Sequence, residues 1–269
     1  MNKTIGLLAG LGRLPVDVAR AACGMGVTVV ALSLVPGTDE ESAKVCHKHQ
    51  EVHVGQLENV IDLLKAEGVE EVVMIGKVTK ERLFDGTTHL DARALRLLAS
   101  LPDRNDDTIL MAIVQELGKE GIRVLDQTHL ISMLLPQPGV LTKRAPNEAE
   151  LADMEFGFAT AKEIGRMDIG QTVVVKNGAV MAVEAIEGTD ACIRRGGMLG
   201  RGGVVVAKTA KPQQDIRFDM PSVGPATLQA MIDAGATALV MEAGRTLLVE
   251  REKTLALADT HNIAILSRA

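Results

Sequence analysis

Apolar runs alternate with helical stretches through the first half of the chain, and this alternation constrains the fold most. Residues 3–9 are a predicted strand that ends in IGLLA, a glycine turn and a helical stretch at 15–24 follow, and residues 27–34 are a second, largely apolar run. The rhythm returns with a helical stretch at 58–67 before the apolar run 69–76. Strands that alternate with helices form a parallel sheet covered on both faces. The sequence therefore predicts an α/β fold whose N-terminal domain is a doubly wound parallel sheet.

Three prolines between residues 136 and 146 interrupt this rhythm. Because clustered prolines are typical of a connection between domains, we predict a first domain over 1–135, a linker over 136–147 and a second domain over 148–269. Beyond the linker the apolar runs are shorter, and Lys-Asn-Gly-Ala between two of them is typical of a β-hairpin. The second domain is therefore predicted to be a separate, mixed α/β domain.

Charge and aromatic content narrow the function. The chain has a formal net charge of −6, no tryptophan or tyrosine, and four phenylalanines. Readers of single-stranded nucleic acid stack bases on aromatic side chains in a basic groove, so nucleic acid is not an expected partner. No apolar run reaches the roughly 18 to 20 residues of a spanning helix, and the three cysteines are an odd number, far apart. We therefore expect neither a signal peptide nor a membrane span, and a cytoplasmic location.

The glycine turn after the first apolar run is the first candidate binding feature. Gly10, Gly12 and Arg13 begin like a dinucleotide-binding turn, but Pro15 stands where the third glycine belongs. The second apolar run also ends without the acidic residue that binds an adenosine ribose, which disfavours a nicotinamide cofactor. Two glycines at a helix start still let backbone N–H groups approach an anion, and Lys77 follows a predicted strand, where ligands of parallel sheets bind. A tight turn without a ligand stays equally open.

A second candidate feature is the turn within residues 184–195. A predicted strand ends near Glu184, the chain turns at a glycine, and Thr189 is placed to cap a short helix. The same turn carries four further charged residues: Glu187, Asp190, Arg194 and Arg195. Since Mg²⁺ takes one or two carboxylates together with phosphate oxygens, this turn suits a magnesium-bridged phosphate. A capped helix with surface salt bridges is the alternative.

A basic stretch covers residues 194–217, with six basic residues and one acidic residue. The basic residues are Arg194, Arg195, Arg201, Lys208, Lys211 and Arg217. In an extended conformation Asp215, Arg217 and Asp219 face the same side, which places a guanidinium between two carboxylates. Beside the lysines and Gln214, this row is typical of a phosphoryl-binding site. A solvated basic surface or a salt-bridged strand edge would show the same pattern.

These segments together resemble one family. GLLAGLGRLP, IGKV and NDDTIL in the first half, and RMDIGQTVVVKNGAVMAVEAIEGTDACIRR, KPQQDIRFDMPSVGP and EAGRTLL in the second, follow one another as in the LpxI-type UDP-2,3-diacylglucosamine pyrophosphatases. The resemblance covers nearly the whole chain. It implies a Rossmann-like N-terminal domain, a separate C-terminal domain and a site between them.

The resemblance also implies an activity. Members of this family hydrolyse the diphosphate of UDP-2,3-diacylglucosamine to UMP and 2,3-diacylglucosamine 1-phosphate (lipid X) during lipid A biosynthesis, and they depend on Mg²⁺. Their essential acidic residue lies in the segment D-[LM]-P-[ST]-[IV]-G, which residues 219–224 match, so Asp219 is the expected catalytic residue. Asp219 is also an expected Mg²⁺ ligand, with Asp190 and Glu187. An acylated substrate further implies peripheral contact with the inner membrane from the cytoplasm.

The remaining candidates are assigned to the substrate. The residues expected to bind it are Gly10, Gly12, Arg13, Lys77, Thr189, Arg194, Arg195, Lys208, Lys211, Gln214 and Arg217. Two rival functions stay open: a non-catalytic nucleotide or lipid sensor, which would not need Asp219, and a nicotinamide oxidoreductase, which Pro15 opposes. The sequence leaves open the acyl-chain length, the carboxylates that contact the metal, and whether the chain forms a homodimer.

Overall fold

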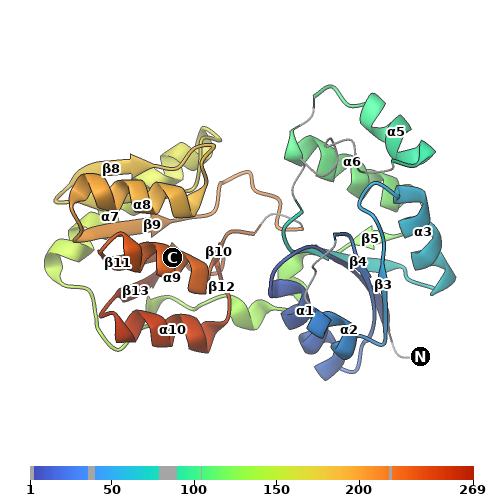
Figure 1. The fold of residues 1–269 in the computed structure, drawn as a ribbon, viewed down its shortest axis with the longest axis horizontal. Helices are drawn as coiled ribbons and strands as arrows, with labels where there is room; N and C mark the ends of the chain where they lie inside the picture. The colour runs from blue at the N-terminus through green and yellow to red at the C-terminus, as the bar shows by residue number, and fades with distance from the viewer. Residues whose placement is uncertain (1–2, 36–39, 79–89, 104, 218–219) are drawn as a thin grey trace. The chain divides into compact units, whose positions relative to one another are not determined.

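The computed structural model describes residues 3–35, 40–78, 90–103, 105–217 and 220–269, without the side chains of residues 40, 106, 107, 129 and 133. The chain divides into two compact units (Figure 1). The first unit comprises Met1–Ile131 and Ile216–Phe218, and the second comprises Ser132–Asp215 and Asp219–Ala269. Each unit is built around its own sheet.

The first unit is a doubly wound parallel sheet. Its strands are β1 (Thr4–Ala9), β2 (Thr28–Ser33), β3 (Lys48–Glu51), β4 (Glu71–Ile75) and β5 (Arg123–Val124). They are hydrogen-bonded in the order β3-β2-β1-β4-β5, and each pairing is parallel. Its α-helices are α1 (Leu14–Gly24), α2 (Glu40–Val45), α3 (Leu57–Ala66), α5 (Ala92–Ala99) and α6 (Asp106–Lys119). The predicted fold class is confirmed.

Apolar side chains bury the central strands of this sheet. In β1 the five residues after Thr4 are buried, and Leu8 packs in one cluster with Ile61 and Leu64 of α3. An uninterrupted apolar strand is what a sheet covered on both faces requires, and this signal was visible in the sequence. Strand β3 lies at the sheet edge and reads KHQE. This polar strand carried no apolar signal, so the sequence did not predict it.

The second unit is a mixed six-stranded sheet. Its strands are β6 (Gly139–Val140), β7 (Thr172–Lys176), β8 (Ala179–Val183), β9 (Val204–Lys208), β11 (Ala236–Glu242) and β13 (Ala264–Arg268). They lie in the order β6-β13-β11-β9-β7-β8. Strands β9, β11 and β13 are parallel to one another, whereas the other pairings are antiparallel. Two short strands, β10 (Ser222–Val223) and β12 (Leu247–Leu248), form a small parallel sheet of their own.

Helices cover both faces of this six-stranded sheet. They are α7 (Glu148–Arg166), α8 (Thr189–Gly200), α9 (Pro225–Asp233) and α10 (Arg251–Thr260). Val173 and Val205 cluster with Met154 of α7, whereas Val174 and Val206 cluster with residues of α8, α9 and α10. Neighbouring residues thus point to opposite faces, as the two-residue period of a strand requires. Helix α7 therefore covers one face, and α8, α9 and α10 cover the other (Figure 1).

Part of the proline-bearing segment is fastened into the second unit. Gly139–Val140 form β6, which pairs with β13. Arg144 donates to both carboxylate oxygens of Glu150 at 2.7 and 2.9 Å, and to the backbone carbonyl oxygen of Asn262 at 2.9 Å. Residues 139–144 are therefore part of the packing of this unit, although their sequence was interpreted as a linker.

Candidate functional site

Many turns of the second unit meet at one edge of its six-stranded sheet. Strands β9, β11 and β13 end at this edge because they are parallel. Strand β7 begins there and β8 ends there, since each runs antiparallel to its neighbour. Helices α8, α9 and α10 follow β8, β9 and β11 along the chain and run back from this edge. Ligands of open α/β sheets bind outside the carboxyl ends of the strands, so this edge is the candidate site.

Three charged side chains at the candidate edge are almost fully buried. Lys208, the last residue of β9, is 5% exposed, and Glu242, the last residue of β11, is 8% exposed. Glu184, which directly follows β8, is 7% exposed. A buried charge is costly unless it is paired and hydrogen-bonded, and all three have such partners. The edge therefore holds charged groups in fixed places.

Glu242 is held by two cations and one backbone N–H group. Lys162 of α7 donates to Glu242 Oε1 at 2.8 Å, and the backbone N–H of Ala210 donates to Oε2 at 2.8 Å. Arg245 Nη1 lies 3.8 Å from Oε1. Neither Glu242 nor Lys162 was predicted from the sequence. The signal for Glu242 was an acidic residue directly after the apolar run ALVM, at the end of a strand.

Lys208, a predicted substrate ligand, also has a structural contact. Its Nζ donates to the carbonyl oxygen of Ser222 at 2.8 Å. The same stretch is held by the small sheet, where the N–H of Leu247 donates to the carbonyl oxygen of Pro221 at 2.9 Å. Lys208 therefore fixes the chain three residues after Asp219.

Glu184 is bound from two sides. Thr189 Oγ1 donates to Oε1 at 2.9 Å, and the backbone N–H of Gln171 donates to Oε2 at 3.3 Å. The prediction that Thr189 caps the helix is wrong, because Gly188, with a φ of 80°, precedes α8 and Thr189 is its first residue. Glycine adopts this left-handed conformation readily, which leaves the Thr189 hydroxyl to bind Glu184.

Glu187 and Asp190, two of the candidate Mg²⁺ ligands, lie just before α8 and in its first turn. Glu187 is paired with Arg195, and the hydrogen bond from Arg195 lowers the pKa of the Glu187 carboxyl. Among the described residues, no group of three or more His, Cys, Asp or Glu side chains is arranged to hold a metal ion. Mg²⁺ needs only one or two carboxylates besides phosphate and water, so Asp190 fits such a site. Glu187 would first have to leave Arg195.

The adjacent arginines of α8 both lie in ion pairs. Arg194 Nε is 3.3 Å from Asp233 Oδ2, and Asp233 is the last residue of α9. Because α9 begins at the candidate edge, Asp233 and Arg194 lie away from it. Arg195 donates to the carbonyl oxygen of Val183 at 2.8 Å, at the end of β8, and is therefore beside the edge. The alternative of a surface salt bridge fits Arg194.

The segment after β9 begins with predicted phosphate ligands that have partners within the second unit. Lys211 Nζ donates to Asp168 at 2.7 Å, and the backbone N–H of Lys211 donates to Gln214 Oε1 at 3.0 Å. Arg245 Nη2 donates to the carbonyl oxygen of Lys211 at 3.2 Å. The structure therefore brings Lys208, Lys211 and Gln214 to the same side of the sheet, at the start of one segment.

The expected row of Asp215, Arg217 and Asp219 is not formed as an extended strand. Residues 216–217 lie in a turn, and no described strand pairs with them. Without a neighbouring strand, nothing holds the chain in the alternating conformation that the prediction assumed. Arg217 belongs to the first unit, where its Nη2 lies 3.2 Å from the sulfur of Met111. Asp219, the expected catalytic residue, lies outside the described residues.

Three side-chain oxygens at the candidate edge have no hydrogen-bond partner among the described residues. Thr209 Oγ1, directly after β9, and Thr246 Oγ1, in the turn after β11, belong to fully buried residues. Gln171 Oε1, directly before β7, is the third. A buried polar atom without a partner costs free energy, so each needs a reason other than stability. None of these residues was singled out in the sequence.

Two glycine-bearing loops lie against each other at the corresponding edge of the first sheet. Gly10 follows β1 and Gly76 follows β4, the two strands at which the strand order reverses. A Cβ on Gly10 would lie 2.7 Å from the carbonyl carbon of Gly76, and Leu11 and Lys77 exchange two backbone hydrogen bonds of 2.9 Å. Gly10 therefore permits the close approach of two loops, at the point where doubly wound sheets bind nucleotides. The Lys77 side chain is exposed.

Gly12 and Arg13 complete the turn before α1. Gly12 has a φ of 103°, which favours glycine whether or not a ligand is near. Arg13 is paired with Glu41 of α2, and its Nε lies 3.7 Å from Asp17 Oδ1. These contacts fasten α1 to α2, so the tight-turn alternative accounts for both residues.

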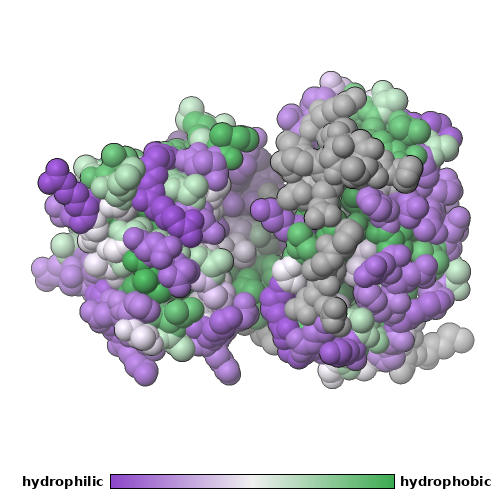
Figure 2. All heavy atoms as spheres, in the orientation of Figure 1, coloured by the Kyte–Doolittle hydropathy of each residue, from purple (hydrophilic) through white to green (hydrophobic). Residues whose placement is uncertain are grey.

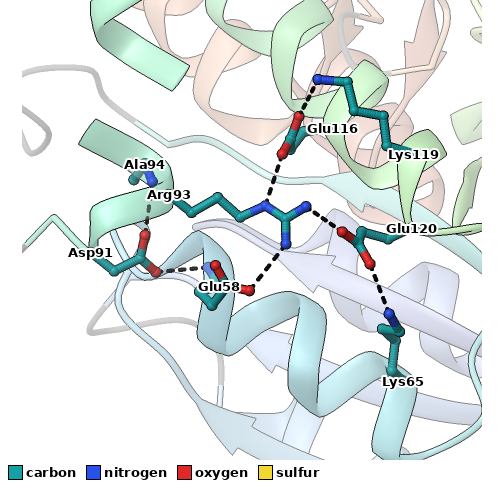
Figure 3. Close-up of polar contacts among 8 residues, drawn as sticks. All are labelled: Glu58, Lys65, Asp91, Arg93, Ala94, Glu116, Lys119 and Glu120. Atoms are coloured by element: carbon teal, nitrogen blue, oxygen red, sulfur yellow. Dashed lines mark hydrogen bonds and ion pairs between the residues drawn. The ribbon is translucent and has the colours of Figure 1, made fainter. Parts of the chain in front are cut away.

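An ion-pair network joins α5 to α3 and α6 in the first unit (Figure 3). Arg93 donates to Glu116 at 2.8 Å and to Glu58 at 3.1 Å, and it pairs with Glu120. Lys65 pairs with Glu120 at 2.7 Å. The hydrogen bonds from Arg93 and Lys65 lower the pKa of Glu120 to about 2. The network is a structural feature that the sequence analysis did not predict.

Hydrophilic side chains cover most of the face shown in Figure 2. None of the helices in the described ranges has both the length and the apolar character that crossing a membrane demands. Apolar side chains are nevertheless exposed along α8 and in the turn before it, at Ile186, Met198 and Leu199. Ile186 is fully exposed and lies between β8 and α8, so an apolar residue borders the candidate edge.

Comparison with known proteins shows one family across both units. Residues 4–134 match the model of the LpxI N-terminal domain, and residues 137–266 match the model of the LpxI C-terminal domain. The UDP-2,3-diacylglucosamine pyrophosphatase LpxI of Caulobacter vibrioides is 34% identical over 275 residues, which cover 98% of this chain and 97% of that protein.

Other similarities are weaker. The bifunctional purine biosynthesis protein PurH of Sinorhizobium fredii is 29% identical over 223 residues, which cover 75% of this chain and 38% of that protein. Among solved structures, CobK precorrin-6A reductase has a TM-score of 0.29 and 13% identity, covering 100% of this chain and 89% of that chain.

Proposed function

The chain belongs to the LpxI family, and from this premise we propose that it hydrolyses the diphosphate of UDP-2,3-diacylglucosamine to UMP and 2,3-diacylglucosamine 1-phosphate in lipid A biosynthesis. The observation that carries the proposal is the 34% identity to UDP-2,3-diacylglucosamine pyrophosphatase LpxI over 98% of the chain. The candidate edge of the second unit supports it, because cations and carboxylates gather there beside the segment that bears Asp219.

Hydrolysis of a diphosphate makes two demands on the protein. The negative charge of the phosphoryl oxygens must be neutralised, and one water molecule must be placed in line with the bond that breaks. Lys208, Lys211 and Arg217 supply cations within one segment, and Asp219 follows two residues later. In the proposed reaction the water oxygen bonds to the sugar-side phosphorus, with Asp219 orienting the water, and the bridging oxygen leaves with UMP.

The helix starts at the candidate edge favour an anion. Helices α8, α9 and α10 begin there, and none has a hydrogen bond from a capping side chain among the described residues. By contrast α7, which begins at the opposite edge, has a capping box formed by Asn147 and Glu150. Uncapped helix starts present free backbone N–H groups, which bind phosphate well.

We also propose that the reaction depends on Mg²⁺. Asp219 and Asp190 would hold the ion, and Glu187 would join them after leaving Arg195. When bound, the ion would supply positive charge to the phosphate oxygens. The lysines of the segment would carry the remaining neutralisation.

The acylated substrate leads us to propose a peripheral site of action at the cytoplasmic face of the inner membrane. The exposed Ile186 between β8 and α8 supports this, because an apolar side chain there can enter the headgroup region beside the candidate edge. Flotation with vesicles of anionic lipid tests it: we expect the wild-type protein to float and Ile186→Asp to float less. Equal flotation of both would remove Ile186 from this role.

Release of UMP from UDP-2,3-diacylglucosamine by the purified protein tests the activity. We expect UMP and lipid X in equal amounts, loss of turnover in EDTA and recovery with Mg²⁺. In ¹⁸O-labelled water the label is expected in the sugar phosphate and not in UMP. The non-catalytic sensor predicts binding of the intact substrate without UMP release, and that result would replace our proposal.

A further inference from the structure

The segment between β9 and β10 bears Asp219, and buried charged side chains fasten it at both ends. We propose that Glu242, together with Lys162, is a positioning residue that fixes the start of this segment and acts on turnover through it. This inference rests on the proposed function, since it concerns the same reaction.

The first fastening is the ion pair between Lys162 and Glu242, which binds both backbone polar groups of Ala210. Glu242 Oε2 accepts the N–H of Ala210 at 2.8 Å, and Lys162 Nζ donates to the carbonyl oxygen of Ala210 at 3.3 Å. Lys162 and Glu242 are joined to each other at 2.8 Å. Ala210 and its bond to Glu242 are buried, whereas the Lys162 side chain is 30% exposed. The peptide groups on either side of Ala210 are therefore held in place by one ion pair.

Two further contacts hold the residues on either side of Ala210. The N–H of Thr209 donates to the carbonyl oxygen of Gln171 at 3.0 Å, and Arg245 Nη2 donates to the carbonyl oxygen of Lys211 at 3.2 Å. Arg245 also lies 3.8 Å from Glu242 through its Nη1. Glu242 thus lies at the centre of the contacts that fix residues 209–211.

The second fastening lies at the other end of the segment. Lys208 Nζ donates to the carbonyl oxygen of Ser222, and β10 pairs with β12 from that residue onward. The ends of the chain between residues 211 and 222 are therefore held by the second unit, whereas Ile216 belongs to the first unit, where its carbonyl oxygen accepts the N–H of Gln127 at 3.1 Å. The candidate phosphate ligand Arg217 and the expected catalytic residue Asp219 both lie in this span.

The chemistry of the first fastening favours a positioning role over a stabilising one. A buried ion pair contributes little net stability, because desolvation offsets its attraction, and an apolar pair can hold two elements together equally well. An ion pair that also binds an N–H and a carbonyl group fixes a direction, which apolar packing does not. The Thr209 hydroxyl beside it, which has no partner within the ranges that the structure describes, also indicates that this stretch is not built for stability alone.

The chain offers a matched control in the same unit. Glu150 is 7% exposed, is paired with Arg144, and accepts the backbone N–H of Asn147 at 2.9 Å. Glu242 has the same three attributes, but Glu150 lies at the start of α7, at the opposite edge of the sheet. Glu150→Gln and Glu242→Gln therefore remove the same kind of interaction in two places.

Steady-state kinetics of UMP release, with Lys162→Met as a second variant, test the inference. We expect Glu242→Gln and Lys162→Met to lower kcat about 10- to 100-fold with KM changed less than about threefold, since a misplaced reacting group affects the transition state most. Hydrogen exchange of residues 209–217 is expected to rise in both variants. Glu150→Gln is expected to keep kcat within about twofold while lowering the melting temperature comparably.

The outcomes separate this inference from the proposed function. A wild-type protein that releases no UMP would remove the proposed function. An active wild-type protein whose Glu242→Gln and Lys162→Met variants keep the kcat of Glu150→Gln would overturn the positioning role. A fall in kcat without faster exchange of residues 209–217 would also overturn it, because the effect would not pass through the segment.

Discussion

In the first unit, glycine backbones meet at the sheet edge where the strand order reverses, and Gly10 and Gly76 leave no room even for a Cβ atom. In the second unit, the corresponding edge holds buried charges, among them Lys208 and Glu242, and hydroxyl groups without a partner in the described part of the chain. Both edges lie at the carboxyl ends of parallel strands. The fold therefore offers a position for a site, and the residues there decide whether it is used.

The helix starts differ less between the two units. In the first unit, α1 begins without a hydrogen bond from a capping side chain among the described residues, whereas α5 is capped by Asp91. In the second unit, α8, α9 and α10 start at the candidate edge without a capping side chain among the described residues. The buried charges of the second edge, more than its helix starts, lead us to place the diphosphate chemistry there.

The largest expected effect is on turnover, from Asp219→Ala. We expect at least about a hundredfold fall in kcat for UMP release, the low end for a positioned acid, base or metal ligand. The variant is expected to fold, as judged by its thermal melt. The matched control is Asp233→Ala, which removes a carboxylate at the end of α9, away from the edge. Turnover of Asp219→Ala within a few-fold of the control would break the comparison.

The next largest expected effect is a loss of stability in the Gly10→Ala variant. The added Cβ would meet the backbone of Gly76 at 2.7 Å, and we expect a loss of about 1–3 kcal/mol in the free energy of unfolding, as for other overpacked sites. Gly24→Ala is the control, because a Cβ there meets no atom within 4 Å. Urea unfolding measures both. An equal effect of the two substitutions would show that the loops at Gly10 and Gly76 do not need the close approach seen in the structure.

At the candidate edge of the second unit, Lys211→Ala is expected to weaken substrate binding. A charge-assisted hydrogen bond contributes about 1.5–3 kcal/mol, which corresponds to roughly a 10- to 150-fold rise in the dissociation constant. Arg194→Ala should leave binding unchanged, since Arg194 is paired with Asp233 on the surface. Titration calorimetry with the Asp219→Ala background measures both. If the two substitutions weaken binding equally, the distinction between edge and surface cations fails.

The smallest effect concerns the Arg93 network in the first unit. The pKa of Glu120 is lowered to about 2 by Arg93 and Lys65, below the ordinary value of about 4.3 that it has when unfolded. The stability that the carboxylate contributes is therefore fully present above that ordinary value and is lost as the pH falls toward 2. Melting temperatures of the wild type and Arg93→Met should differ at pH 7, and the difference should begin to shrink below the ordinary pKa of about 4.3 and vanish as the pH falls toward 2. A difference that stays constant would remove the ionic role.

The sequence predicted the elements whose signal lies within a few consecutive residues. Apolar runs such as 5–9 marked buried strands, and Asn177-Gly178 marked a hairpin whose two residues have positive φ values of 51° and 73°. The polar edge strand β3 was missed, because an exposed strand needs no apolar residues. Gly139–Val140 were interpreted as linker, because the strand that they pair with, β13, comes more than a hundred residues later.

The candidate site was harder to predict from sequence. Lys208, Lys211 and Glu184 stand beside recognisable turns, so their charge could be noticed. Glu242 and Lys162 are 80 residues apart and meet only because α7 packs across the sheet. The extended row of Asp215 and Arg217 was predicted from a two-residue period, but that period holds only where a neighbouring strand pairs with the chain.

The central claim, that the diphosphate binds at the edge of the second sheet, is tested most directly by hydrogen exchange of the Asp219→Ala variant with and without UDP-2,3-diacylglucosamine. We expect slower exchange in residues 184–195 and 208–224 when the substrate is bound. Slower exchange confined to the turns at residues 10–15 and 76–78 of the first unit would contradict it.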